Sequence, residues 1–444
     1  MNKIKIVWIV NDLYINNFIS VYKEIMKNNN IFDIKIIATT HVNHDDLRSI
    51  SSLTIHKFLN ENNINNIDCY DKDHNLFDIK SLNPDYVFYL TPYNYYLPDE
   101  YNSSIVSKYA KVCAINYGAD MIQYSGMYSV MIENNFWKDC YRFFCESKYF
   151  NKFEGITEKT IPVGYLKLDE YLYYDKKNFL SNNGDKKDRK KVIWKPRWTL
   201  DADSSFVSYI DKMISYMETN SKTDFVIYLH PLINYKIKKI GYEKNLNIQK
   251  KKINKLKNVK IIEDHNFLDE ILTGDIYISE HSSTLVEFTI TGNPIIYCDG
   301  PVKLNDLGKK IIENSYVSKN IDETLILLDS LINNNDYKKE KREKEKNSYF
   351  FVPPLNYSSA QYLLLLLLED YINNEGFNQE LRNNYYIEKE KLKKENSIKS
   401  NEIIKKDKII DELNTTIKNL YTSNSWKITS IFRYFKKIIR RIND

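Results

Sequence analysis

The chain has 444 residues, enough for two domains of ordinary size and an additional segment. Its formal net charge of +5 is small for this length, which argues against a nucleic-acid-binding protein. The five cysteines show no C-x-x-C spacing, which argues against a disulfide scaffold or a zinc module and suits a reducing cytoplasm. No apolar run approaches the roughly 20 residues of a membrane span, so we expect a cytoplasmic protein.

Residues 1–175 alternate between apolar runs and amphipathic patterns, and they form the first predicted domain. We predict strands at Ile4–Val10 and Asp33–Ala38, within Leu82–Tyr93, and at Lys111–Asn116, Phe143–Ser147 and Ile161–Tyr165, with helices at Phe18–Met26 and Asp45–Asn62. Strands that alternate with helices indicate a parallel sheet covered on both faces.

Residues 190–345 repeat this alternation after a polar linker and form the second predicted domain. We predict strands at Val192–Trp194, Phe225–Leu229, Val259–Ile262, Asp275–Ile278 and Pro294–Tyr297, with helices at Phe206–Met217, Phe267–Leu272 and Thr284–Thr289. Two doubly wound parallel-sheet domains that face one another across a cleft form the GT-B arrangement, which many nucleotide-dependent transferases share. The sequence therefore predicts an α/β protein of the GT-B class, with an acceptor domain followed by a nucleotide-binding domain.

The C-terminal part is predicted to be a helical extension. Residues 351–373 form a leucine-rich helix that braces the two domains, and residues 380–420 form a charged helical linker. Isoleucines at heptad spacing, Ile403, Ile410 and Ile417, indicate a short coiled coil through which the chain could form a homo-oligomer. Residues 425–442 form a basic amphipathic helix that fits an anionic membrane surface. The alternative is a helix docked on its own protein with a solvated basic face.

The most distinctive polar cluster lies where a predicted strand passes into a helix. It comprises Glu280, His281, Ser282, Ser283 and Thr284. Unpaired backbone N–H groups and the positive end of the helix dipole meet there, which favours a phosphate ligand. The plainer interpretation is that Ser282 or Ser283 only caps the helix.

Other candidate donor-site residues follow neighbouring strands or lie in the same helix. Arg197 could pair bidentately with phosphate, or it could be an ordinary surface residue. His230 could hydrogen-bond a phosphate oxygen or transfer a proton near neutral pH. Glu287 could accept hydrogen bonds from ribose hydroxyls, or it could be a solvent-facing carboxylate.

The first domain offers a candidate acceptor side. Tyr117, Gly118 and Asp120 follow a predicted strand, and Gly118 would let a ligand approach the backbone closely. Asp120 is a candidate base for an acceptor hydroxyl. The competing interpretation is a plain turn in which Asp120 caps a helix.

These motifs resemble the CDP-glycerol glycerophosphotransferase family, which builds teichoic-acid-type and capsular polymers. The resemblance covers about Ile4 to Asp370 and rests on the following segments: Lys195-Pro196-Arg197-Trp198, His230-Pro231, Glu280-His281-Ser282-Ser283, Glu287-Phe288 and Pro294-Ile295-Ile296-Tyr297. It implies that Ser282, Ser283 and Arg197 hold the cytidine diphosphate and that His230 acts at the transferred phosphate. The family has a His-Gly that supplies the catalytic base, and Tyr117-Gly118 stands in its place here. Asp120 or His230 would then be the substitute base.

The tail carries a second resemblance, because Ser425-Trp426-Lys427-Ile428-Thr429 is similar to the tail of many bacterial surface-polysaccharide glycosyltransferases. We therefore expect a transferase on the inner face of the cell membrane that moves glycerol phosphate from CDP-glycerol to a hydroxyl of a glycan or lipid-linked acceptor. No metal, cofactor or nucleic acid is expected to take part. Two alternatives remain: a GT-B glycosyltransferase that uses a nucleotide sugar, and a non-catalytic membrane-associated scaffold.

Overall fold

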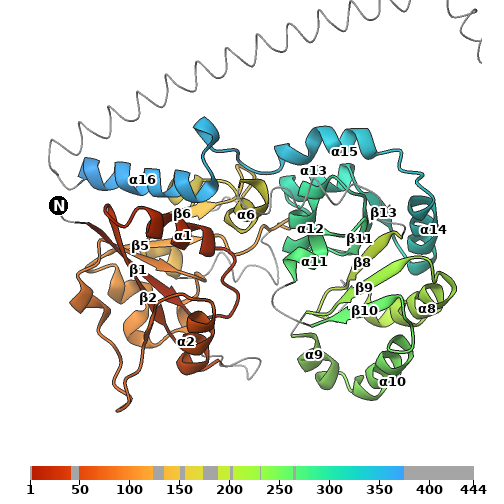
Figure 1. The fold of residues 1–444 in the computed structure, drawn as a ribbon, viewed down its shortest axis with the longest axis horizontal. Coiled ribbons are helices and arrows are strands. Elements are labelled where there is room, and N and C mark those ends of the chain that lie inside the picture. The colour runs from red at the N-terminus through yellow and green to blue at the C-terminus, as the bar shows by residue number, and fades with distance from the viewer. Residues whose placement is uncertain are drawn as a thin grey trace, which may run out of the picture. The chain divides into compact units, whose positions relative to one another are not determined.

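The computed structural model describes residues 3–41, 50–123, 135–150, 156–173, 189–200, 204–230, 232–263 and 267–374. These residues form two parallel sheets, and both sheets belong to one compact unit, Met1–Glu369. Figure 1 shows the strands gathered into two groups, red to yellow for the first sheet and yellow-green to blue-green for the second. The predicted α/β architecture with two doubly wound parallel sheets is confirmed.

The first sheet has the strand order β3-β2-β1-β4-β5-β6-β7, and every neighbouring pair is parallel. Its strands are β1 (Ile4–Val10), β2 (Phe32–Ala38), β3 (Ile67–Asp68), β4 (Tyr86–Tyr89), β5 (Lys111–Ile115), β6 (Cys140–Cys145) and β7 (Thr160–Pro162). Its helices are α1 (Ile19–Lys27), α2 (Ser52–Glu61), α3 (Ser103–Val106), α5 (Phe136–Asp139) and α6 (Asp169–Leu172). Short 3-10 turns are η1 (Ile79–Leu82), η2 (Asn94–Tyr96), η3 (Asp99–Tyr101), η5 (Thr157–Lys159) and η6 (Leu166–Leu168). Strand β4 is buried along its whole length, as expected for a sheet covered on both faces.

The second sheet has the strand order β10-β9-β8-β11-β12-β13, again entirely parallel. Its strands are β8 (Lys191–Lys195), β9 (Asp224–Tyr228), β10 (Val259–Ile262), β11 (Ile276–Ser279), β12 (Ile295–Cys298) and β13 (Tyr316–Ser318). Its helices are α8 (Phe206–Thr219), α9 (Ile233–Lys239), α10 (Glu243–Ile253), α11 (Leu268–Leu272), α12 (Ser283–Phe288), α13 (Asp306–Glu313), α14 (Ile321–Ile332) and α15 (Lys339–Glu345), with 3-10 turns η7 (Thr289–Thr291) and η8 (Lys346–Ser348). In both sheets the carboxyl ends of parallel strands meet at one edge, which is where ligands bind in such folds.

Helix α2 starts later than the sequence predicted. The expected helix began at Asp45, but Ile50 lies outside the helix and pairs with His41 in an isolated bridge. Ser51 then accepts a hydrogen bond from the Thr54 N–H at 3.2 Å and caps the helix, which begins at Ser52. The capping hydroxyl, rather than the apolar pattern, sets the start of this helix.

After the second sheet the chain returns to the first. The Phe351 N–H donates to the Glu146 carbonyl at 2.8 Å, η9 (Pro354–Asn356) follows, and α16 (Ser359–Asn374) begins. Asp169 accepts hydrogen bonds from the backbone N–H groups of Ser359 at 3.0 Å and Ala360 at 2.8 Å. These contacts hold the start of α16 to the end of the first half.

Several predictions about the C-terminal part lie outside the described residues. They concern the charged linker at 380–420 and the basic helix at 425–442. Among the helices that the structure does describe, each is too short or too polar to cross a membrane. All five cysteines lie in the described part and none of them forms a disulfide.

Candidate functional site

A pocket of about 290 Å³ lies between the carboxyl edges of the two sheets. Eight of the residues singled out from the sequence line it: Tyr117, Gly118, Asp120, Arg197, His230, His281, Ser282 and Ser283. Five further residues complete the lining: Ala119, Met121, Ile122, Lys195 and Trp198. Three loops of the second sheet and one loop of the first therefore meet at a single cavity.

The loop after β5 reaches across to the second half of the chain. The Asn305 side chain donates to the Asp120 carbonyl at 2.8 Å, and the Asn305 N–H donates to the Met121 carbonyl at 3.0 Å. Gly308 in α13 permits this approach, because a Cβ there would lie only 2.2 Å from the Met121 carbonyl oxygen. Two hydrogen bonds from Asn305, one from its side chain and one from its backbone N–H, thus hold the backbone of Asp120 and Met121 to the second half of the chain.

The start of α12 forms the opposite wall of the pocket. Ser282 is extended at the N-cap position, and its hydroxyl accepts from the Leu285 N–H at 3.2 Å. The first N–H groups of a helix have no partner within the helix, so that of Ser283, which lines the pocket, is suited to an anion. A Cβ at Gly118 would lie 3.2 Å from the Ser283 Cβ, so the two walls come close together here.

Glu280 lies behind the pocket rather than in its lining. Its carboxylate is buried and accepts hydrogen bonds from the backbone N–H groups of Arg197, at 2.9 Å, and Ser205. Burial raises the pKa of Glu280, and these N–H donors act against that rise. Glu280 therefore shapes the Arg197 loop from the inside.

Arg197 itself faces the pocket with its guanidinium group held in place. Its Nε donates to the Thr199 hydroxyl at 3.0 Å, and its Nη1 donates to the His281 carbonyl at 3.5 Å. Burial, followed by repulsion from Arg197 and Lys195, lowers the pKa of His281 to about 3. His281 is therefore neutral at physiological pH and adds no charge to the pocket.

Lys195 is a pocket residue to which the sequence analysis gave no role of its own, although it belongs to the Lys195–Trp198 segment. It ends β8 and is only 6% exposed. Burial lowers the pKa of Lys195 to about 8, despite attraction from Glu280 and Glu287. The signal in the sequence was a lysine at the carboxyl end of an otherwise apolar strand, two residues before Arg197.

His230 is held in one tautomer. Its Nδ1 accepts a hydrogen bond from the Leu232 N–H at 3.1 Å, so the proton of the neutral ring is on Nε2. The ring stacks on Trp198 with 5.6 Å between the centroids, which fixes its plane. A neutral His230 can therefore act through Nε2 as a hydrogen-bond donor.

Tyr117 stands opposite, and its hydroxyl lies 3.1 Å from that of Tyr93. Desolvation and the nearby Asp120 raise the pKa of Tyr117 to about 12. Tyr117 therefore keeps its proton at neutral pH and cannot replace a histidine as a base.

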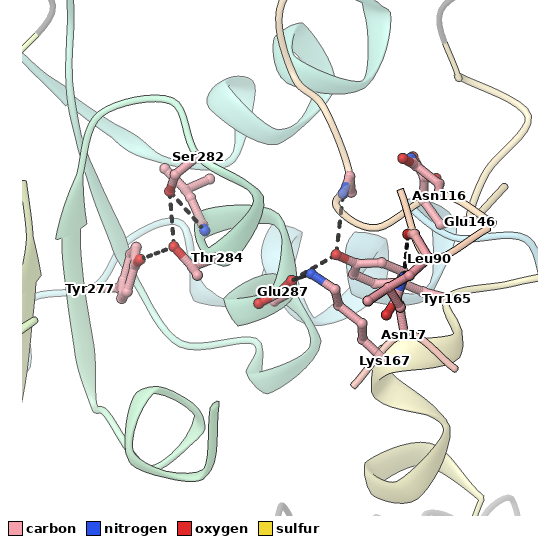
Figure 2. Close-up of polar contacts among 12 residues, drawn as sticks. Asn17, Leu90, Asn116, Glu146, Tyr165, Lys167, Tyr277, Ser282, Thr284 and Glu287 are labelled. Carbon is pink, nitrogen blue, oxygen red and sulfur yellow. Dashed lines mark hydrogen bonds and ion pairs between the residues drawn. The ribbon is translucent and has the colours of Figure 1, made fainter. Parts of the chain in front are cut away.

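Thr284 and Glu287 do not line the pocket. The Thr284 hydroxyl lies 2.7 Å from the Tyr277 hydroxyl beneath α12. Glu287 is fully buried, so it is neither solvent-facing nor open to a ribose, and its Oε1 accepts from the Tyr165 hydroxyl at 2.7 Å and from Lys167 at 3.2 Å (Figure 2). These two partners come from the end of the first sheet.

The Tyr165 hydroxyl joins both walls of the pocket. It donates to Glu287 on α12 and accepts from the Ala119 N–H at 3.2 Å in the loop after β5 (Figure 2). One hydroxyl thus connects the helix that carries Ser283 with the loop that carries Asp120.

Comparison with known proteins finds solved structures with a similar fold but no protein with a similar sequence. No protein-family model matches the chain, and no curated protein matches it. Among solved structures, the S. aureus MnaA-UDP complex has a TM-score of 0.53 at 11% identity, and the match covers 84% of this chain and 97% of that one. UDP-GlcNAc 2-epimerase from Neisseria meningitidis, bound to UDP-GlcNAc, has a TM-score of 0.52 at 13% identity, covering 83% and 100%.

A third solved structure is the wall teichoic acid polymerase TagF, soaked with CDPG. It has a TM-score of 0.51 at 14% identity, and the match covers 84% of this chain and 90% of that chain. The likeness thus extends over both sheets rather than one of them. The fold is GT-B. At such low identity the GT-B likeness concerns the arrangement of the chain alone, and activity has to be argued from the pocket.

In the GT-B frame, the pocket between the two sheets contains residues with complementary properties. Lys195 and Arg197 supply positive charge, His230 supplies a donor, and Asp120 supplies a carboxylate on the other wall. In the described part of the chain, no group of three His, Cys, Asp or Glu side chains could hold a metal ion. The arrangement suits an anionic ligand whose charge faces the second sheet.

Proposed function

We propose that this protein transfers glycerol phosphate from CDP-glycerol to a hydroxyl of a cell-surface glycan or a lipid-linked polymer. The observation that carries the proposal is the meeting of Lys195, Arg197 and the Ser282-Ser283 turn on one wall with Asp120 on the other. The motif resemblance to CDP-glycerol glycerophosphotransferases supports it. The likeness to TagF, a wall teichoic acid polymerase solved with CDPG, is consistent with it.

The donor's diphosphate binds against the second sheet. Lys195 and Arg197 neutralise its negative charge, and the guanidinium can donate two parallel hydrogen bonds to phosphate oxygens. The N–H group of Ser283 adds a donor that costs no rearrangement during the reaction. His230 donates from Nε2, because its Nδ1 is occupied by the Leu232 N–H.

The reaction is a displacement at phosphorus. The acceptor hydroxyl oxygen attacks the phosphorus that bears glycerol, a new P–O bond forms, and the bond to the bridging oxygen of CMP breaks. The electron pair stays on CMP, whose added charge is stabilised by Lys195 and Arg197. Asp120 takes the proton of the acceptor hydroxyl, and Tyr117 remains protonated beside it.

A nucleotide-sugar glycosyltransferase is the second candidate. The observation that favours it is Tyr117, which stands where the resembled family has its basic histidine and which keeps its proton. Two structural neighbours were solved with UDP or UDP-GlcNAc. The same phosphate-binding wall would then hold a nucleoside mono- or diphosphate leaving group. Membrane attachment through residues 425–442, at the inner face of the cell membrane, is part of both proposals.

The test is to incubate the full-length protein with CDP-glycerol, CMP-sialic acid and a panel of UDP-sugars and to measure the released nucleotide. We expect CMP from CDP-glycerol, with a rate at least tenfold lower in Arg197→Ala and about a hundredfold lower in Asp120→Asn. Release from a nucleotide sugar alone would favour the second candidate. Absence of turnover with every donor would leave only the scaffold alternative.

A further inference from the structure

The segment 232–263 concentrates positive charge on the second half of the molecule. It contains ten lysines and two glutamates, a formal charge of +8, whereas the whole 444-residue chain carries only +5. The remainder of the chain is therefore net negative. Lysine abundance alone does not produce such a difference, because acidic residues balance the lysines elsewhere.

This charge lies on α9 and α10, two neighbouring helices that connect β9 to β10 (Figure 1). Helix α10 buries Leu246, Gln249 and Ile253. The spacing of four and three residues places Lys244, Ile248 and Lys251 on the opposite face, and these three side chains are exposed. The outer face of α10 therefore combines lysines with an aliphatic side chain.

Two isoleucines are exposed among the lysines. Ile240, directly after α9, is 51% exposed, and Ile248 in α10 is 47% exposed. Most of the surrounding lysines are not neutralised by carboxylates. Only Lys250, paired with Glu263, and Lys260, paired with Glu270, form ion pairs among the described residues of this segment.

We propose that the α9–α10 surface docks on an anionic lipid membrane. Each lysine near such a surface gains from its negative potential, and the two isoleucines can enter the boundary between head groups and acyl chains. A soluble polyanion would satisfy the lysines but would make no use of exposed aliphatic side chains. This docking surface is separate from the basic helix expected at 425–442, and it does not depend on which donor the pocket binds.

The surface lies close to the pocket along the chain. Helix α9 begins at Ile233, three residues after His230, and the Lys236 ammonium lies 5.6 Å from the Trp198 ring that lines the pocket. Docking through α9–α10 brings the pocket next to the bilayer surface. An acceptor that is linked to a lipid would then need to extend only a short way from the membrane.

The test is co-sedimentation of the full-length protein with vesicles of phosphatidylglycerol and of phosphatidylcholine. The variant Lys244→Glu/Lys251→Glu/Lys255→Glu is compared with Lys339→Glu/Lys341→Glu/Lys344→Glu, which reverses three exposed charges on α15. We expect the first variant to bind phosphatidylglycerol vesicles on the order of 100-fold more weakly, since each lysine contributes separately. The α15 variant should bind phosphatidylglycerol vesicles like the wild type. Neither variant should bind phosphatidylcholine vesicles.

The aliphatic contact is tested with Ile248→Ser against Ile326→Ser, which changes an isoleucine that is 69% exposed on α14. Ile248→Ser should weaken vesicle binding, and Ile326→Ser should not. All substituted side chains are exposed, and thermal unfolding checks that each variant is folded. Equal losses in the two triple variants would overturn the proposal. Unchanged vesicle binding in Ile248→Ser, with competition by soluble polyphosphate, would assign the surface to a soluble polyanion instead.

Discussion

At the scale of single residues, the pocket depends on charges whose state is set by burial. Lys195 is the clearest case, because desolvation lowers its pKa to about 8 despite attraction from Glu280 and Glu287. A phosphate ligand needs the charged form of this lysine. Donor binding should therefore depend on pH near pH 8. His281 is neutral there and does not contribute to this pH dependence.

The first prediction concerns this dependence. The dissociation constant for CDP-glycerol should rise above about pH 8, by up to tenfold per pH unit, because Lys195 loses its proton in the free protein. In Lys195→Arg the rise should move to higher pH, since a guanidinium stays charged. Fluorescence or calorimetric titrations from pH 6 to 10 measure this dissociation constant in both proteins. A flat profile in the wild type, or an identical rise in Lys195→Arg, would show that Lys195 does not contact the donor.

The sequence predicted the pocket residues that lie in loops directly after strands. It did not predict the roles that depend on contacts between distant segments. Arg197, His230 and Ser283 follow apolar runs, so the rule for sheet edges brought them together. Lys195 was placed in the loop before Arg197 and given no role, whereas it is the buried last residue of β8. Glu287 was expected to bind a ribose. Its actual partner, Tyr165, lies 122 positions away in the sequence and could not be predicted from it. Such a contact leaves no local pattern.

At the scale of elements, the two walls of the pocket are joined by the Tyr165 hydroxyl. It binds Glu287 on α12 and the Ala119 N–H in the loop after β5, so the position of Asp120 is tied to that of Ser283. This geometry assigns Tyr165 a positioning role. Tyr165 itself is not among the residues that line the pocket.

The second prediction is that Tyr165→Phe lowers kcat by more than it raises the KM for the donor. Loss of the hydroxyl leaves two buried polar groups without this partner, which should lower the free energy of unfolding by about 1–3 kcal/mol. The control is Tyr89→Phe, which removes the buried bond from the Tyr89 hydroxyl to the Tyr101 carbonyl, 2.8 Å long, in the first sheet. Both variants should lose stability, as measured by denaturant unfolding, but only Tyr165→Phe should lose kcat. Equal kcat values in the two variants would leave Tyr165 with a structural role only.

Element boundaries show what local patterns can predict. The long strands β1 and β2 and the helix α8 were expected nearly where they lie, because their apolar periodicity is strong. The two-residue strand β3 and the three-residue strand β13 were not expected, since so few residues carry no periodicity. Their pairing is decided by the neighbouring strands β2 and β12 rather than by their own sequence.

At the scale of the whole molecule, the sequence predicted the GT-B class but not how closely the sheets approach. That approach rests on small residues, Gly118 beside Ser283 and Gly308 beside Met121. The sequence analysis expected Gly118 to make room for a ligand and did not single out Gly308, because the contacts of both glycines join distant segments. The charge of the α9–α10 surface likewise could not be interpreted from the sequence alone. The structure shows that α10 buries one face, so its lysines lie on an outer face.

The central claim is that one pocket holds a nucleoside diphosphate donor through the cations at the end of β8. Its most direct test is calorimetric titration of CDP-glycerol into the wild type, Arg197→Ala and Arg189→Ala. Arg189 precedes the opposite end of β8 and pairs with Asp224, so it is a matched control away from the pocket. We predict similar dissociation constants for the wild type and Arg189→Ala and a value ten- to a hundredfold higher for Arg197→Ala. Absence of binding to the wild type, or equal affinities in the two variants, would contradict the claim.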